Sequence, residues 1–294
     1  MTIQSMITDS DIHQKLTQEH PDTDFLVISQ AISRALHQSV TRCVLEHQTA
    51  KKLSLFLTTY GGDPHGGYRV ARCLRHHYEH IRLIVPSYCK SAGTLIAIAA
   101  NELAIGDMGE LGPLDVQVTK PSEPQERGSG LDVMTALTSC ADHAQQVYTM
   151  FYQRARLTLR MSPKVAGEVA SQVVAGLMAP LYSQIDPLRI GEMQRAMSIT
   201  LEYGTRLNGH SSNLKDGSLD KLVIQYPAHG FVIDRKEAGD LFHKVSTLSD
   251  AERYTAEKLW HIVGDQNDLG PYFIRSSPAP APPEGENHGL QAKQ

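Results

Sequence analysis

The stretch "VPSYCKSAGTLIAIAANELAIGD" (residues 85–107) places Ser91 between a lysine and an Ala-Gly pair, directly after an apolar run that ends at Val85. The small and β-branched residues that follow, 94–100, predict a buried helix, and 102–107 predict a return to a sheet. Ser91 is therefore expected at the turn from a strand into a helix, where free backbone amides lie.

The preceding residues show the same alternation of strands and helices. Short β-rich runs at 24–29, 52–59 and 81–86 predict strands, and helical spacing of apolar residues at 30–47 and 67–80 predicts the helices between them. Strands separated by helices of this length imply crossover connections. The predicted fold class is α/β, with a largely parallel sheet covered on both faces.

The second half of the chain has a different character. Residues 118–130 are polar and rich in Pro and Gly, which predicts an exposed loop, and three helical patterns follow within 131–207. Residues 221–245 are expected to form a strand, a turn and a helix that Asp234 caps.

These patterns divide the chain into three parts. Residues 1–23 are expected to be an N-terminal helical extension, and 24–264 the main domain, with 131–207 as a helical insert. Residues 265–294 include the Pro-rich run "SSPAPAPPEGENHGLQAKQ" with few apolar side chains, which predicts a disordered tail.

Charge and composition narrow the function classes. Lys and Arg number 28 against 32 Asp and Glu, a net charge of −4, so no basic excess favours nucleic acid. We expect no membrane span and no leader, and hence a cytoplasmic protein. The four cysteines (Cys43, Cys73, Cys89 and Cys140) lie far apart and are expected to be reduced, and no spacing predicts a metal or another cofactor.

The residues around Ser91 are compatible with two roles for this serine. It could simply cap the helix, because serine is a preferred capping residue, or it could be a nucleophile that a carbonyl approaches over Ala92 and Gly93. Gly61 and Gly62 end the preceding strand and could aim amides outward as an oxyanion hole. Their alternative is a tight turn or a phosphate loop, but the spacing G-G-D-P-H-G-G fits no common phosphate motif.

The segments "LFLTTYGGDP", "VPSYCKSAGTLIAIAANELAIGDMGELGPLDVQ" and "YPAHGFVIDRKEAGDLF" resemble, in order and spacing, the serine dehydrogenase proteinase (SDH) family of Clp-fold serine proteinases. That family is related to Clp peptidase and signal peptide peptidase. The resemblance implies a Clp/crotonase-like superhelix of ββα units, a peptide or protein substrate, and a homo-oligomer. It also implies that Ser91 is the nucleophile and that Gly61, Gly62 and Ala92 supply oxyanion amides.

The general base is the least determined part of the predicted site. Signal peptide peptidase relatives use a lysine after the active-site strand, but residues 131–148 contain none. Clp peptidases have a histidine after the serine's strand and an aspartate before a late helix, and these positions fall here near Asp115 and His229. The resemblance therefore implies a triad with exchanged positions, in which His229 is the base and Asp115 orients it, with Lys90 and Lys120 as alternatives. His229 could instead be a structural turn residue.

Three function classes follow from these residues. The first is a serine peptidase that acts through Ser91 and needs no ATPase in this chain, so that any unfolding partner is a separate protein. The alternatives are a catalytically inactive Clp-fold binding or scaffold protein, and a crotonase-type acyl-CoA enzyme, which needs no serine nucleophile.

Overall fold

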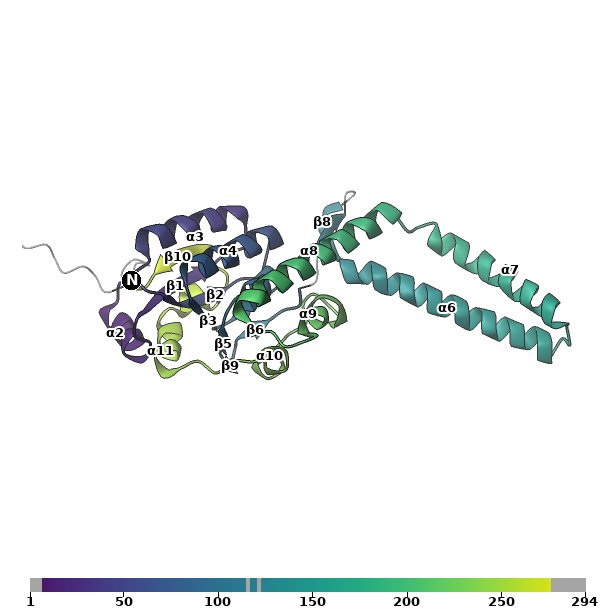
Figure 1. Ribbon diagram of the computed structural model, residues 1–294. Helices are drawn as coiled ribbons and strands as arrows, with labels where there is room; N and C mark the ends of the chain where they lie inside the picture. Colours follow the sequence, from purple (N-terminus) through teal and green to yellow (C-terminus); the bar gives the residue numbers. More distant parts are fainter. Residues whose placement is uncertain (1–6, 115–116, 121–122, 276–294) are drawn as a thin grey trace, which may run out of the picture.

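A six-stranded sheet forms the centre of the molecule (Figure 1), and the computed structural model describes residues 7–114, 117–120 and 123–275. Its order is β10 (Leu269–Phe273), β1 (Thr23–Ser29), β2 (Lys52–Thr58), β3 (His80–Val85), β5 (Glu102–Ile105) and β9 (Val245–Ser246). All neighbours are parallel except β10, which runs antiparallel to β1.

Helices cover both faces of this sheet (Figure 1). One face packs against α3 (Arg34–His47), α4 (Pro64–His77) and α5 (Ala92–Ile98), and the other against α2 (Ser10–Glu19), α11 (Asp250–Lys258) and α12 (Trp260–Val263). Successive strand residues point to opposite faces, so β1 sends Leu26 and Ile28 into the first core and Phe25 and Val27 into the second. The predicted α/β class with a largely parallel sheet is confirmed.

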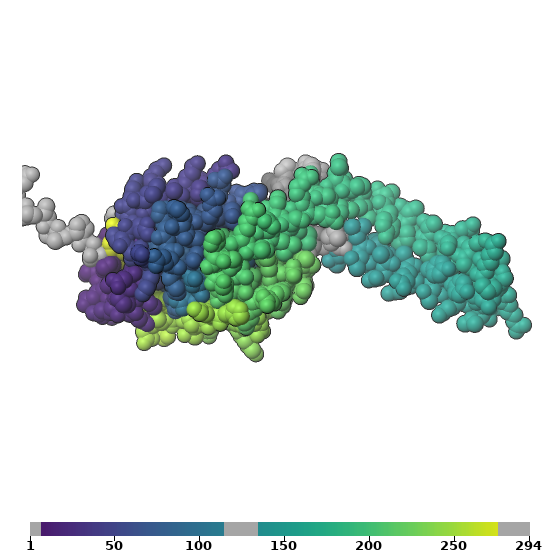
Figure 2. All heavy atoms as spheres, viewed as in Figure 1, coloured from purple at the N-terminus to yellow at the C-terminus, as the bar shows by residue number. Residues whose placement is uncertain are grey.

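A helical arm projects from this body (Figures 1 and 2). It consists of α6 (Gly130–Leu157) and α7 (Pro163–Tyr182), which pack side by side, and α8 (Pro187–Ser211) leads the chain back to the sheet. Ser162 and Asp186 cap α7 and α8, each followed by a proline in the first turn. The helices of the predicted insert are present, and α8 extends to residue 211.

By length and composition alone, α7 is apolar enough to cross a membrane, and 17% of its most apolar window is buried. No such stretch was expected from the sequence. A single helix of this kind is weak evidence for a span, and the absence of a membrane span stays a prediction.

Two of the predicted segments differ in the structure. The loop expected at 118–130 contains an antiparallel pair, β7 (Gln117–Lys120) and β8 (Glu123–Ser129). Backbone hydrogen bonds define this pair, and the sequences of its strands show no alternation of apolar residues that would predict it. The strand expected from residue 221 is a π-helical turn, η1 (Lys221–Gln225), which continues the short helix α9 (Ser218–Asp220). The helix that Asp234 caps, α10 (Arg235–Leu241), is confirmed.

The C-terminal boundary was predicted wrongly. Residues 265–275 are not part of a disordered tail, because β10 pairs with β1 and Ile274 is buried. Pro271 argues against a strand in the sequence, because proline has no N–H to donate to a neighbouring strand. β10 tolerates it because the strand lies at the edge of the sheet. The rest of the predicted tail, 276–294, lies outside the described residues.

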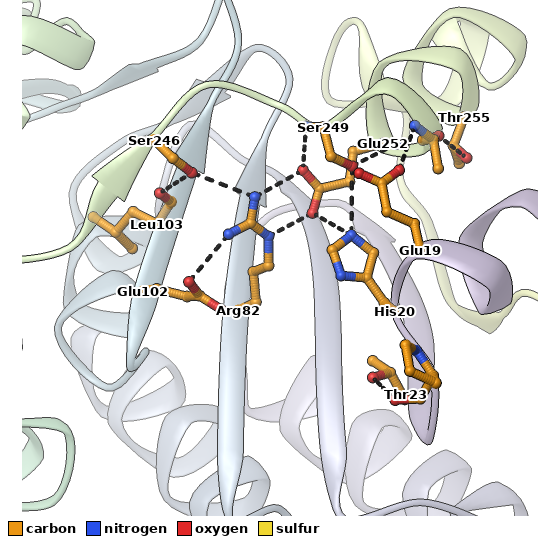
Figure 3. A network of polar contacts seen from close by, with 12 residues as sticks. Glu19, His20, Thr23, Arg82, Glu102, Leu103, Ser246, Ser249, Glu252 and Thr255 are labelled. Atoms are coloured by element: carbon orange, nitrogen blue, oxygen red, sulfur yellow. Dashed lines mark hydrogen bonds and ion pairs between the residues drawn. The ribbon is translucent and has the colours of Figure 1, made fainter.

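The predicted N-terminal extension contains a helix that belongs to the core. Ile12 and Leu16 of α2 are buried in the second core. At the end of this helix His20 reaches the buried carboxylate of Glu252, which also binds Arg82 of β3 at 2.5 and 3.0 Å (Figure 3). This network joins α2, β3 and α11, so the boundary at residue 23 does not separate an independent segment.

Candidate active site

The carboxyl ends of the parallel strands bring the predicted site residues to one edge of the sheet. The loop after β2 carries Gly61 and Gly62, and the segment after β3 carries Ser91. Gly62 forms a bridge with Ile32 after β1, and Thr59 forms one with Cys89. Ligands of open α/β sheets bind at this edge.

Ser91 occupies the capping position of α5, yet it does not act as a cap. Its side chain makes no capping hydrogen bond, and its backbone has φ 51° and ψ −114°. A positive φ is costly for a residue with a Cβ, and backbone strain of this kind recurs at active sites. The alternative that Ser91 is merely a helix cap is therefore not supported, and the turn has the sharp strand-to-helix geometry of a nucleophile site.

Gly61 lies against Ser91. A Cβ on Gly61 would be 2.7 Å from the Cβ of Ser91 and 2.9 Å from the carbonyl oxygen of Lys90. Gly61 and Gly62 have φ of 106° and 142°, which side chains rarely adopt. Only a glycine at position 61 therefore leaves enough space for the side chain of Ser91.

The backbone amides of Gly62 and Ala92 differ from that of Gly61. Gly62 is exposed, and within the described ranges its N–H makes no hydrogen bond; the N–H of Ala92, the buried first residue of α5, makes none either. The N–H of Gly61 already donates to Oγ1 of Thr59 at 3.0 Å. Of the three predicted oxyanion donors, Gly62 and Ala92 thus have available amides, and Gly61 does not.

Two threonines that the sequence analysis did not single out hold this geometry. Thr59 fixes the Gly61 peptide, and buried Thr94 of α5 donates to the carbonyl oxygen of Gly112 at 2.7 Å. Gly112 follows β6 (Glu110–Leu111), which pairs with β4 (Tyr88–Cys89). Both threonines stand inside the quoted motifs, but only the fold shows their partners.

Lys90 points away from the reaction into an ion pair. Its Nζ lies 2.6 Å from the Glu110 carboxylate, and both side chains are largely buried. Cys89 is buried, as predicted, and burial raises the pKa of its thiol. Glu110 thus engages the ammonium of Lys90, and the buried Cys89 thiol is held in its neutral form.

The predicted base is only partly located. His229 lies half-buried in the turn after η1, and in the described part of the chain no histidine or lysine side chain forms a hydrogen bond with Ser91 Oγ. Asp115 lies outside the described residues, and so does the side chain of Lys120. No group of three or more His, Cys, Asp and Glu able to hold a metal occurs among the described residues.

Two solved structures of proteases are similar to this chain. A variant of the 1510-N membrane-bound stomatin-specific protease has 14% identity and a TM-score of 0.33, covering 50% of this chain and 68% of the other. A ClpP1 variant from Listeria monocytogenes has 14% identity and a TM-score of 0.36, covering 80% and 98%. These scores are too low to carry an argument by themselves.

Two uncharacterized proteins of Methanocaldococcus jannaschii are similar in sequence over a shorter segment. MJ0137 is 32% identical over 87 residues, which cover 30% of each chain. MJ1495 is 33% identical over 66 residues, which cover 22% of this chain and 23% of the relative. The chain thus matches less than a third of the length of either relative.

The family model of the ClpP-like SDH-type serine proteinases matches residues 25–127. That segment begins with β1 and contains the glycine pair, Ser91 and α5. The resemblance inferred from the motifs is confirmed: over this segment the chain is similar to the ClpP-like SDH-type serine proteinases.

Proposed function

We propose that the chain is a serine peptidase whose nucleophile is Ser91. The observation that carries the proposal is the backbone of Ser91, held at positive φ against Gly61 at the start of α5, with its hydroxyl unused for capping. A nucleophile and preorganised amide donors are what acyl transfer requires.

The reaction follows from these parts. Ser91 Oγ attacks the peptide carbonyl and its proton passes to the base, while the amides of Gly62 and Ala92 stabilise the oxyanion. The C–N bond breaks as the base returns the proton to the amine. Water then hydrolyses the acyl-enzyme by the same route, which restores Ser91.

We assign the base to His229 and its orientation to Asp115. The segment of His229 is tied to the strands that carry Ser91, because Ile233 bonds both ways with Leu111 of β6, at 2.9 and 3.1 Å. In the sequence, His229 is four residues before Ile233 and Asp115 four residues after Leu111, so both stand close to this bridge along the chain. Lys90 is the weaker candidate because Glu110 engages its ammonium.

The same proposal includes the substrate class, the location and the oligomeric state of the protein. A peptide or protein is the substrate, the protein acts in the cytoplasm as a homo-oligomer, and any unfolding partner is a separate protein. The arm supports an oligomer, because α7 exposes Leu177, Leu181 and Tyr182 at 43–52% of their surface. Such apolar side chains on a projecting helix favour association.

Labelling with a fluorophosphonate tests the nucleophile, because only an activated serine is phosphonylated. The natural chain and a Ser198→Ala control should be labelled and should hydrolyse peptides, whereas Ser91→Ala should do neither. Ser198 is an exposed serine of α8 bonded to its own helix, so it matches the change without touching the site. Hydrolysis by Ser91→Ala at the natural rate would exclude the assignment. A correctly folded natural chain that is never labelled would favour the scaffold alternative.

A further inference from the structure

A cationic groove of about 920 Å³ runs between α3, α4 and α8. Four arginines line it (Arg34, Arg69, Arg72 and Arg75), together with five histidines, and no carboxylate is among its lining residues. Helices α4 and α8 lie side by side on the face seen in Figure 2, in blue and green. This concentration of cations stands out in a chain whose net charge is −4.

The arginines of the groove lack charge partners. None of the four forms an ion pair in the part of the chain that the structure describes; Arg75 donates to Oδ1 of Asn101 and to the carbonyl oxygen of His210, and its Nε is buried without a hydrogen bond. Burial lowers the pKa of Arg75, and burial together with Arg69, Arg34 and Arg72 lowers the pKa of His37. Arg69, Arg72 and Arg75 follow one another at three-residue intervals on α4, so their positive charges are neighbours on the helix surface. An anion bound in the groove would reduce the repulsion among them.

The groove begins next to the candidate active site. His65 lines it three residues after Gly62, and a Cβ on Gly67 of the same helical turn would lie 3.1 Å from the carbonyl oxygen of Ala92. From there the groove follows α4 to His77. A 14-residue helix is about 21 Å long, which corresponds to roughly six residues of extended peptide.

Tyr203 of α8 joins the two walls of the groove. It stacks on Tyr68 of α4 with ring centroids 4.1 Å apart, and its hydroxyl lies 2.9 Å from Nδ1 of His65. The groove is therefore built by packed side chains of two helices, and it is longer than a single phosphate requires. Its length and its start at the site fit an extended chain.

We propose that this groove binds an acidic stretch of the polypeptide substrate, outside the segment that Ser91 cleaves. The proposal rests on the proposed peptidase function and names its substrate class: proteins with several Asp or Glu residues close to the scissile bond. Nucleic acid is also negatively charged, but the net charge of −4 on the whole chain disfavours binding to its phosphate backbone.

Binding can be measured without turnover in the full chain carrying Ser91→Ala. The probes are two fluorescein-labelled peptides of equal length, one with about six consecutive Glu residues, the length that the groove spans, and one with Gln in their place. We expect the acidic peptide to bind about tenfold more tightly at low salt, with the difference falling as salt rises.

The Arg69→Gln/Arg72→Gln variant should lose roughly fivefold or more of this affinity. The matched control is Arg42→Gln/Arg253→Gln, which removes the same charge from exposed arginines of α3 and α11 outside the groove, and it should bind as before. In the chain with Ser91 intact, the groove variant should raise KM for an acidic peptide with kcat unchanged, and leave a neutral peptide unaffected.

Several outcomes would overturn the proposal. These are equal binding of the two peptides, an equal loss in the control variant, tighter binding of an oligonucleotide through the same arginines, or a changed oligomer size in the groove variant, which would make the groove a contact between copies. If acidic peptides bind through Arg69 and Arg72 but no peptide is hydrolysed, the peptidase function fails and the bound segment is not a substrate.

Discussion

Gly61 and Ser91 lie so close that a Cβ on the glycine would be 2.7 Å from the Cβ of the serine. The side chain of Ser91 therefore occupies the space that any residue other than glycine would need. The geometry of the nucleophile depends on a residue 30 positions earlier in the chain.

Replacing that glycine should disable the site. In Gly61→Ala the new Cβ collides with Ser91, and alanine rarely adopts the φ of 106° found at this position. Ser91 must therefore shift, and a shift of about 1 Å costs roughly 10²-fold in kcat. The measurement is kcat for a fluorogenic peptide, with the thermal midpoint recorded alongside. Gly191→Ala, at a position of α8 with open space around it, is the control and should keep full activity. Full activity of Gly61→Ala would show that the contact is not required.

The identity of the base can be decided by two substitutions. His229→Ala should lower kcat by about 10²-fold or more, and added imidazole should restore part of it, because a small base can enter the vacated space. Lys90→Arg should keep most activity, since arginine maintains the ion pair with Glu110 but cannot accept a proton. Lys120→Ala should likewise cost little. Should His229→Ala be active and Lys90→Arg or Lys120→Ala inactive, the site is a Ser/Lys dyad.

The Glu252 network predicts a loss of stability in acid. Burial by itself raises the pKa of Glu252, but hydrogen bonds from His20 and Arg82, the charge of Arg82 and the Ser249 amide outweigh it and lower the pKa to about 2. The folded pKa thus lies below the unfolded one, so the stabilisation is complete above about pH 4.5 and is lost as the pH falls towards 2.

Glu252→Gln should therefore destabilise the protein by up to about 3 kcal/mol at neutral pH, because the largely buried Arg82 keeps only the more exposed Glu102, at 3.2 Å, as an ion-pair partner. Denaturant unfolding at a series of pH values measures this. The difference from the natural chain should shrink below pH 4.5, whereas Glu257→Gln, an exposed carboxylate on the same helix, should follow the natural chain throughout. A constant difference down to pH 2 would contradict the assignment.

The C-terminal strand predicts a sharp limit for truncation. A chain ending at residue 275 should keep its thermal midpoint, whereas one ending at 265 should lose several degrees or fail to fold, because β1 loses its antiparallel neighbour and Ile274 leaves the second core. Differential scanning calorimetry of both chains measures this. Equal midpoints for the two would mean that β10 contributes nothing.

The exposed apolar face of α7 predicts the oligomer contact. Leu177→Glu/Leu181→Glu should reduce the mass measured by light scattering, because charges replace apolar side chains that we expect to be buried between copies. Gln172→Glu, which adds charge at an exposed position of the same helix, should leave the mass unchanged. A natural chain that is already monomeric would contradict the proposed oligomer.

Much of the architecture follows from local patterns. The strands and helices from 23 to 105 have periods of apolar residues that are complete within each segment, so their predicted bounds are close to the observed ones. Where pairing or packing with distant residues decides the structure, prediction failed: β10 depends on β1, and η1 replaces a strand although Leu222 and Val223 are as apolar as a strand requires.

The sequence by itself determined that Ser91 follows a strand, begins a helix and has small neighbours, because these properties are encoded within a few residues. The tertiary structure alone decided that Gly61 touches Ser91, that Thr59 engages the Gly61 amide, that Glu110 holds Lys90, and that four arginines meet in one groove. Each of these contacts joins separate segments of the chain, and only the packing of parallel strands and their helices brings those segments together.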